Sequence, residues 1–165
     1  MKTIKLIAFS ALWISASASF GHENTPHTAS NRPVVKEQKD WGIAGDAKAV
    51  RRTITVRMSD DMRFAPNHIE VREGDTVRLR AENKGKVLHE IVIGTKAELD
   101  AHAEMMKKHP GMEHDEPYMA HVAAGKTGDI VWQFNRAGSF DFACLIPGHY
   151  QAGMTGTITV LPRNK

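Results

Sequence analysis

Short runs of alternating apolar and polar residues dominate the chain from Arg52 onward. Such alternation has the two-residue period of a strand that buries one face. The runs are residues 52–58, 68–71, 76–82, 90–94, 127–134, 139–144 and 155–160. Turn-forming residues separate several of them, including Pro66-Asn67 and Ala137-Gly138. Many short strands and few helices predict an all-β domain, a sandwich or barrel with Greek-key connections.

Aromatic residues fall on the apolar positions of these runs. We expect them to fill much of the core, with Phe64 as a further core residue because its neighbours are polar. The strand aromatics are Trp132, Phe134, Phe140 and Phe142.

One segment has helical periodicity instead. Residues 96–109, KAELDAHAEMMKKH, lie between two strand runs and end before Pro110-Gly111, a helix stop. A 3.6-residue wheel places Leu99, Ala103 and Met106 on one face, which predicts packing against the sandwich. His102, Met105 and His109 lie on the adjoining face, which that packing does not require.

The chain before Arg52 divides into two parts. Residues 1–18 read as a secretory signal: Lys2 and Lys5 precede the apolar stretch 6–16, and Ala16-Ser17-Ala18 is a small-x-small cleavage site. The apolar stretch is too short to span a membrane, which needs about 20 residues. Residues 19–50 lack hydrophobic periodicity and predict a flexible tail, which leaves a domain of residues 51–165. The expected location is the periplasm.

Charge and cysteine content narrow the chemistry. Loss of the signal removes two of 22 basic residues and leaves 20 against 19 acidic ones. No basic stripe with interleaved aromatics suggests a nucleic-acid partner. The single cysteine, Cys144, cannot form an internal disulfide, so an exported chain keeps a free thiol that needs another explanation.

Metal ligation explains that thiol. Residues 144–154, CLIPGHYQAGM, place Cys144, His149 and Met154 at five-residue intervals, with Pro147, Gly148 and Gly153 to form tight turns. A thiolate, two imidazoles and a weak axial thioether make a type 1 blue-copper site. The competing interpretation, a buried small cysteine beside a core methionine, does not account for the spacing.

Two segments resemble the cupredoxins. GSFDFACLIPGH (138–149) is similar to their last strand and ligand loop, and MRFAPNHIEVREGDTVRLRAEN (62–83) to their N-terminal half. The likeness covers Arg52 to Val160 and implies a Greek-key cupredoxin sandwich with residues 96–121 as a Met/His-rich insertion. It also implies His89 as the second imidazole ligand. His68 is the rival, but it lies beside the Pro66 turn, where we expect a solvated histidine.

The sequence departs from the family at one position. Many cupredoxins carry Asn or Ser directly after the first histidine ligand, and here the residue is Glu90. A carboxylate this close to the metal is expected to bond backbone N–H groups or to alter the colour and potential of the site, since residues around the ligands tune a metal.

Residues 102–121 predict a second copper-binding region. They hold four of the nine histidines and four of the eight methionines, and thioether and imidazole together suit Cu(I). The alternative is a polar loop with methionines as gap-fillers. The candidates are His102, Met105, Met106, His109, Met112, His114, Met119 and His121.

A weaker metal candidate lies at the N-terminus. Cleavage after Ser19 would begin the mature chain Phe20-Gly21-His22, whose amine, amide nitrogens and imidazole suit square-planar Cu(II). Cleavage after Ala18, the expected cut, breaks that spacing. We therefore interpret His22 and His27 as ordinary tail residues.

The resemblance implies a small copper-binding protein rather than an enzyme. The chain lacks the His-x-His pairs and the second cysteine that cluster-bearing copper enzymes and copper-A centres need, and it holds only one domain. The insertion favours an exported copper-tolerance cupredoxin. The alternative is an electron carrier that docks through Pro147, Ala152 and Met62. The expected partners are copper ions and a periplasmic redox or copper-handling protein.

Overall fold

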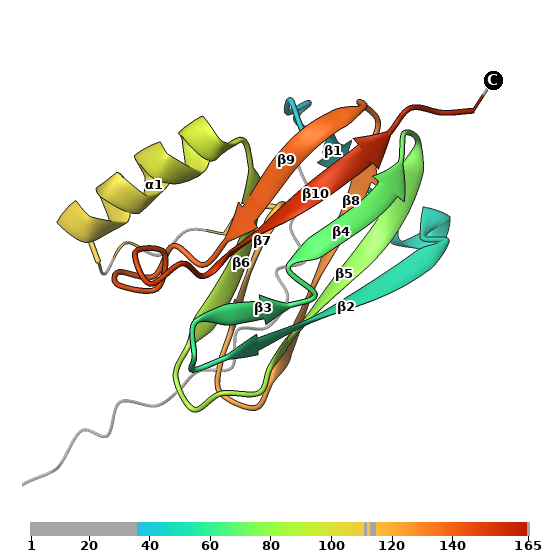
Figure 1. Cartoon of the computed structure of the whole chain (residues 1–165). Helices are drawn as coiled ribbons and strands as arrows, with labels where there is room; N and C mark the ends of the chain where they lie inside the picture. Colours follow the sequence, from blue (N-terminus) through green and yellow to red (C-terminus); the bar gives the residue numbers. More distant parts are fainter. Residues whose placement is uncertain (1–35, 111, 113–114, 165) are drawn as a thin grey trace, which may run out of the picture. The chain divides into compact units, whose positions relative to one another are not determined.

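The computed structural model describes residues 36–110, 112 and 115–164, which form two five-stranded sheets (Figure 1). The first sheet has the order β1 (Ile43–Ala44), β8 (Thr127–Phe134), β5 (Asp75–Asn83), β2 (Arg52–Ser59), β3 (Arg63–Ala65). The second has the order β4 (His68–Arg72), β10 (Thr155–Leu161), β9 (Gly138–Ala143), β6 (His89–Gly94), β7 (Met119–Val122). The predicted all-β sandwich is confirmed.

Every predicted strand run forms a strand, and the chain changes sheet repeatedly. Two pairs are parallel: β2 with β5, in the register Arg52↔Val77, and β4 with β10, in the register His68↔Thr157. The remaining ladders are antiparallel. Strands β1, β3 and β7 were not predicted. β1 and β3 are too short to show a period of two, and burial along β7 does not alternate.

The predicted aromatic core is also confirmed. Trp132, Phe134 and Phe142 are fully buried, and Phe140 is nearly so. Phe64 of β3 is 4% exposed and packs edge-on against Phe142, with ring centroids 4.9 Å apart. An aromatic pair in this geometry joins the two sheets near the loop that follows β9.

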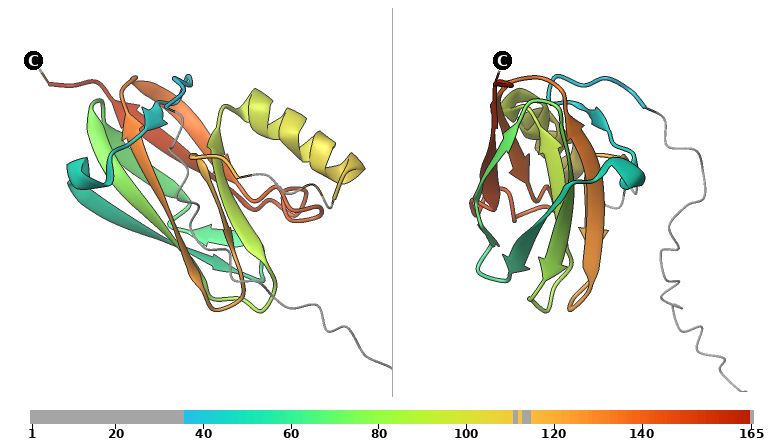
Figure 2. Two further views of the ribbon diagram at one scale, coloured as in Figure 1. Left: turned by 180° about the vertical axis from the view of Figure 1, so that it is seen from behind. Right: turned by 90° about the vertical axis from the view of Figure 1, so that its right-hand side faces the viewer.

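The helix forms as predicted, as α1 (Lys96–Lys108). Thr95 caps its N-terminus: the Thr95 hydroxyl accepts from the Glu98 backbone N–H, and the Glu98 carboxylate accepts from the Thr95 backbone N–H. Leu99, Ala103 and Met106 are buried, as the wheel predicts. Figures 1 and 2 place α1 outside the second sheet, so that β6 is buried along its whole length.

The prediction of a flexible tail over residues 19–50 is wrong for its C-terminal part, which packs on the domain. Ile43 and Ala44 of β1 pair with β8, and Trp41 is 3% exposed, with its carbonyl accepting from Trp132 Nε1 at 2.9 Å. A short 3-10 helix, η1 (Ala47–Ala49), follows. A two-residue strand and one anchoring tryptophan have no periodicity to detect, which is why this segment resembled a tail.

The predicted signal peptide and the residues His22 and His27 lie outside the described residues. Within residues 36–164, apart from the gaps stated above, no helix is long and apolar enough to cross a bilayer.

Trp41→Ala tests whether this segment belongs to the domain. The substitution empties a buried aromatic site, so we expect the free energy of unfolding of the copper-free protein to fall by about 3–5 kcal/mol. Urea unfolding measures the change. Lys48→Ala, on an exposed residue of η1, serves as the control and should change stability by less than about 0.5 kcal/mol. Equal stabilities for the two variants would contradict the anchoring role of Trp41.

Candidate metal centre

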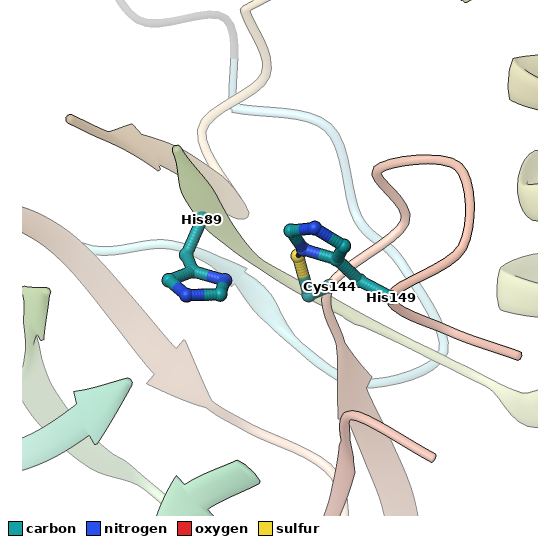
Figure 3. A group of neighbouring side chains, drawn as sticks. All are labelled: His89, Cys144 and His149. Carbon is teal, nitrogen blue, oxygen red and sulfur yellow. Dashed lines mark hydrogen bonds between the residues drawn. The ribbon is translucent and has the colours of Figure 1, made fainter. Parts of the chain in front are cut away.

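Three side chains converge at one end of the sandwich (Figure 3). His89 begins β6, Cys144 directly follows β9, and His149 lies in the loop between β9 and β10. One ligand atom from each lies within 4.8 Å of the others. The Cys144 sulfur is 3.2 Å from His149 Nδ1, and the two imidazole rings are 5.0 Å apart between centroids. The structure therefore brings together two imidazoles and the one thiol of the chain.

Backbone hydrogen bonds shape the loop that carries Cys144 and His149. The Cys144 N–H donates to the Met154 carbonyl at 3.1 Å, and the Met154 N–H donates to the His149 carbonyl at 3.1 Å. Gly148 and Gly153 have φ values of +93° and +87°, a region that other residues rarely enter. Met154 is fully buried in the same core cluster as Cys144, so the loop directs a thioether inward beside the thiol.

A carboxylate orients the His89 ring. His89 is fully buried, and its Nε2 lies 3.2 Å from Asp60 Oδ1, while its Nδ1 is buried with no hydrogen-bond partner. A buried polar atom without a partner is costly, and a metal ion would relieve that cost. A carboxylate on the opposite ring nitrogen is the usual second partner of a metal-binding histidine.

The sequence analysis missed Asp60, which follows β2 and lies 29 residues before His89. Its carboxylate also accepts from the Lys86 N–H at 2.8 Å. That backbone hydrogen bond, followed by the one from His89, holds the pKa of Asp60 below its usual value. Only the packing of the two sheets reveals this contact, since an acidic residue in a turn is ordinarily solvated.

Burial sets the protonation of the copper-free site. It raises the pKa of the Cys144 thiol to about 12, so the thiol keeps its proton at neutral pH and a metal must displace it. Burial also lowers the pKa of His149, and the neighbouring His89 lowers it further. His149 is therefore a neutral imidazole at neutral pH, the form that binds metals.

The donor set fits copper. One thiolate and two imidazoles, with a buried thioether beside them, match the trigonal His₂Cys site with a weak axial methionine. His68, the rival second imidazole, is exposed, and its Nδ1 lies 2.8 Å from the Thr157 hydroxyl. The structure does not bring His68 to the site.

Comparison with known proteins identifies the family. Residues 51–161 match the copper-binding proteins of the plastocyanin/azurin family. The chain belongs to this family. These are the cupredoxins that the ligand loop resembles, and copper is accordingly the metal of the centre.

Two relatives and one solved structure support the same family assignment. The chain is 48% identical over 158 residues, 94% of each chain, to "Copper-resistant cuproprotein CopI" of Rubrivivax gelatinosus. It is 35% identical to the protein of the same name from Pseudomonas aeruginosa, over 74% of this chain and 83% of that one. The crystal structure of auracyanin B superposes with a TM-score of 0.62 at 25% identity, covering 75% of this chain and 97% of that one.

At the position where this cupredoxin departs from its family, the carboxylate bonds the backbone. Glu90 is 2% exposed, and its Oε1 accepts from the Leu145 N–H at 2.6 Å. The Glu90 N–H in turn donates to the Cys144 sulfur at 3.4 Å. The first of the two expectations for Glu90, a bond to backbone N–H groups, is met, and the structure shows that the N–H belongs to the Cys144 loop.

The Met/His-rich insertion of this cupredoxin has two kinds of residue. Met106 and Met119 are buried against the sandwich, and His121 Nε2 lies 2.8 Å from Glu90 Oε2. Met105, His109 and Met112 are exposed, and His102 is half-buried. His114 lies outside the described residues. Burial thus divides the candidate copper ligands of residues 102–121 into a buried group and a group that is accessible to solvent.

Asp60→Ala tests the orientation of His89. Without the carboxylate the ring loses the contact that fixes its tautomer, so copper affinity should fall by about 10-fold to 100-fold. A competition titration against a chelator of known affinity measures it. Asp61→Ala, which removes the neighbouring exposed carboxylate, is the matched control and should bind as the wild type does. Unchanged affinity in Asp60→Ala would show that this contact does not position the ligand.

Proposed function

We propose that the chain is a periplasmic copper-tolerance cupredoxin whose type 1 site consists of His89, Cys144, His149 and Met154. The observation that carries the proposal is the convergence of a buried thiol with two imidazoles, one of which holds a buried, unpartnered Nδ1. The names of the relatives, copper-resistant cuproproteins, support the role in tolerance. The signal-like residues 1–18 support the location.

Copper bound at such a site exchanges one electron between Cu(I) and Cu(II). The protein supplies ligand atoms whose positions are already set: Cys144 directly follows β9, His89 begins β6, and backbone hydrogen bonds pin the loop between β9 and β10 that carries His149. Complete burial of Cys144 and His89 keeps water from the sulfur side of the site, while the half-buried His149 reaches toward solvent. Such a centre can bind and redox-cycle copper with little rearrangement.

The exposed part of the insertion is the proposed second copper region. Met105 and Met112 are two of only four large apolar side chains that are exposed among the described residues. Exposed thioethers next to exposed His109 contribute nothing to the core, and they offer soft ligands for Cu(I). Half-buried His102, and His114 beyond the described residues, complete the proposed set. Additional copper capacity is what a tolerance protein needs and an electron carrier does not.

A second function, electron transfer to a periplasmic redox enzyme, has its own support. Pro147 and Ala152 of the ligand loop are exposed beside His149, and Val87 and Leu88 are 43% and 48% exposed directly before His89. An apolar surface around a redox centre suits transient docking. Copper stoichiometry distinguishes the two functions, because the electron carrier requires only the type 1 ion.

We further propose that the protein acts by binding copper and not as an enzyme. In the described part of the chain one cluster of potential metal ligands stands together, formed by His89, Cys144 and His149. A thiolate with two imidazoles is a donor set for binding copper and exchanging its electron, and the printed name of the relatives, copper-resistant cuproprotein, describes the same kind of role.

Cys144→Ser tests the ligand set. Loss of the thiolate removes the sulfur-to-copper charge transfer, so the intense visible absorption of the Cu(II) protein should disappear. Met154→Leu is the matched variant: it removes only the weak axial ligand, so the colour should persist and the reduction potential should rise. Visible spectra and redox titration measure both. An intense visible band in Cys144→Ser would refute the assignment.

Exposed insertion residues should determine copper capacity. The triple variant Met105→Leu/His109→Gln/Met112→Leu leaves the buried face of α1 intact, and we expect it to lose the Cu(I) bound beyond the first equivalent while keeping the visible band. A Cu(I) competition titration of the copper-free protein counts the ions.

Glu104→Gln/Lys107→Gln is the control for that titration. It alters the same helix at an exposed ion pair, keeps the net charge and removes no sulfur or imidazole. Wild-type binding that stops at one ion would instead support electron transfer.

A further inference from the structure

Glu90 is a buried carboxylate whose two oxygens bond different parts of the chain. Oε1 accepts from the Leu145 N–H at 2.6 Å, and Oε2 lies 2.8 Å from His121 Nε2. Its side chain is 2% exposed and that of His121 is 27% exposed. Buried carboxylates are rare unless they are paired, so this residue has a specific partner on each side.

The two partners belong to segments with different roles. Leu145 directly follows Cys144, the thiolate ligand. His121 lies in β7, opposite Glu90 in the β6–β7 ladder, where the insertion returns to the sheet. One side chain on the strand of His89 therefore connects the backbone of the Cys144 loop to the insertion.

A second contact ties the insertion to the other side of the same loop. The Tyr150 hydroxyl, next to His149, donates to Asp100 Oδ1 of α1 at 2.5 Å. Lys96 holds the same carboxylate at 2.7 Å. The insertion is thus linked to the ligand loop directly beside His149, through Asp100 and Tyr150, and beside Cys144 through Glu90.

We propose that Glu90 and His121 form a positioning pair through which the insertion holds the Cys144 loop and sets the reduction potential of the copper site. Hydrogen bonds to a carboxylate in a buried setting are about twice as strong as neutral ones. Contacts around the metal ligands tune the potential. The pair also gives His121 a role at the type 1 site and removes it from the proposed second copper region. This inference rests on the ligand set proposed above.

Two substitutions should shift the potential in opposite directions. His121→Ala removes a hydrogen-bond partner from the carboxylate, so the negative charge of Glu90 near the copper is less compensated, and the potential should fall because Cu(II) is favoured. Glu90→Gln removes the charge but keeps an oxygen that accepts from Leu145, and so raises the potential. A residue that only filled space would change stability and leave the potential unmoved.

Amide hydrogen exchange of Leu145 in the copper-free protein tests the contact without any metal. His121→Ala should speed this exchange by roughly tenfold or more, the effect of weakening a hydrogen bond to a charged group. Glu90→Gln keeps an oxygen in place to accept from Leu145, although a neutral one, and should speed the exchange less than His121→Ala does. His68→Ala, at an exposed histidine on β4, is the matched control and should leave both exchange and potential as in the wild type.

The outcomes separate this inference from the ligand assignment. Wild-type exchange and wild-type potential in His121→Ala would overturn the positioning pair, even if Cys144→Ser has confirmed the thiolate ligand. Faster exchange in His121→Ala with a lowered potential would support it. If the wild-type protein lacks the visible band, the proposed ligand set is wrong. In that case unchanged exchange of the Leu145 amide in His121→Ala would by itself overturn the positioning pair.

Discussion

The hydrogen bond from the Cys144 N–H to the Met154 carbonyl is the contact on which the metal centre depends. It extends the β9–β10 ladder, whose last pair is Ala143↔Thr155, by one step beyond the strands. With both ends pinned, the chain must reverse its direction within the short intervening loop. The thiol, the imidazole of His149 and the Met154 thioether consequently emerge at the same end of the sandwich. The buried Phe142 and Ile158 on the two strands keep that ladder in register.

The centre also depends on the packing of one sheet against the other. His89 comes from the second sheet, whereas Asp60, which orients its ring, follows β2 of the first. A separation of the sheets would lose this contact and admit water to the thiol. Burial of that thiol has two effects: it holds the proton of Cys144 at neutral pH when copper is absent, and it leaves the sulfur in a setting where a metal, and not solvent, is the favourable partner.

The insertion is an integral part of this domain. Leu99 and Ala103 of α1 pack on Val92 and Leu145, which face the outer side of the second sheet. This cover permits β6 to be buried along its whole length. The adjoining face of α1 is solvated and carries Met105, and exposed His109 caps the C-terminus of the helix. Helix α1 can therefore stabilise the type 1 site through its buried face and present soft ligands to solvent on its exposed face.

The sequence by itself determined the strands, the helix and the candidate ligands that lie close together in the chain. Alternation with a period of two is a local property of burial, and the Cys144–His149–Met154 spacing encodes a local loop, so both could be read directly. His89 was accessible only through the resemblance to cupredoxins. The tertiary structure decided what depends on contacts between distant segments: the anchoring of Trp41, the Asp60–His89 contact and the Glu90–His121 pair. Each joins residues whose separation in the chain carries no periodic signal, because packing between sheets, and not local propensity, brings them together.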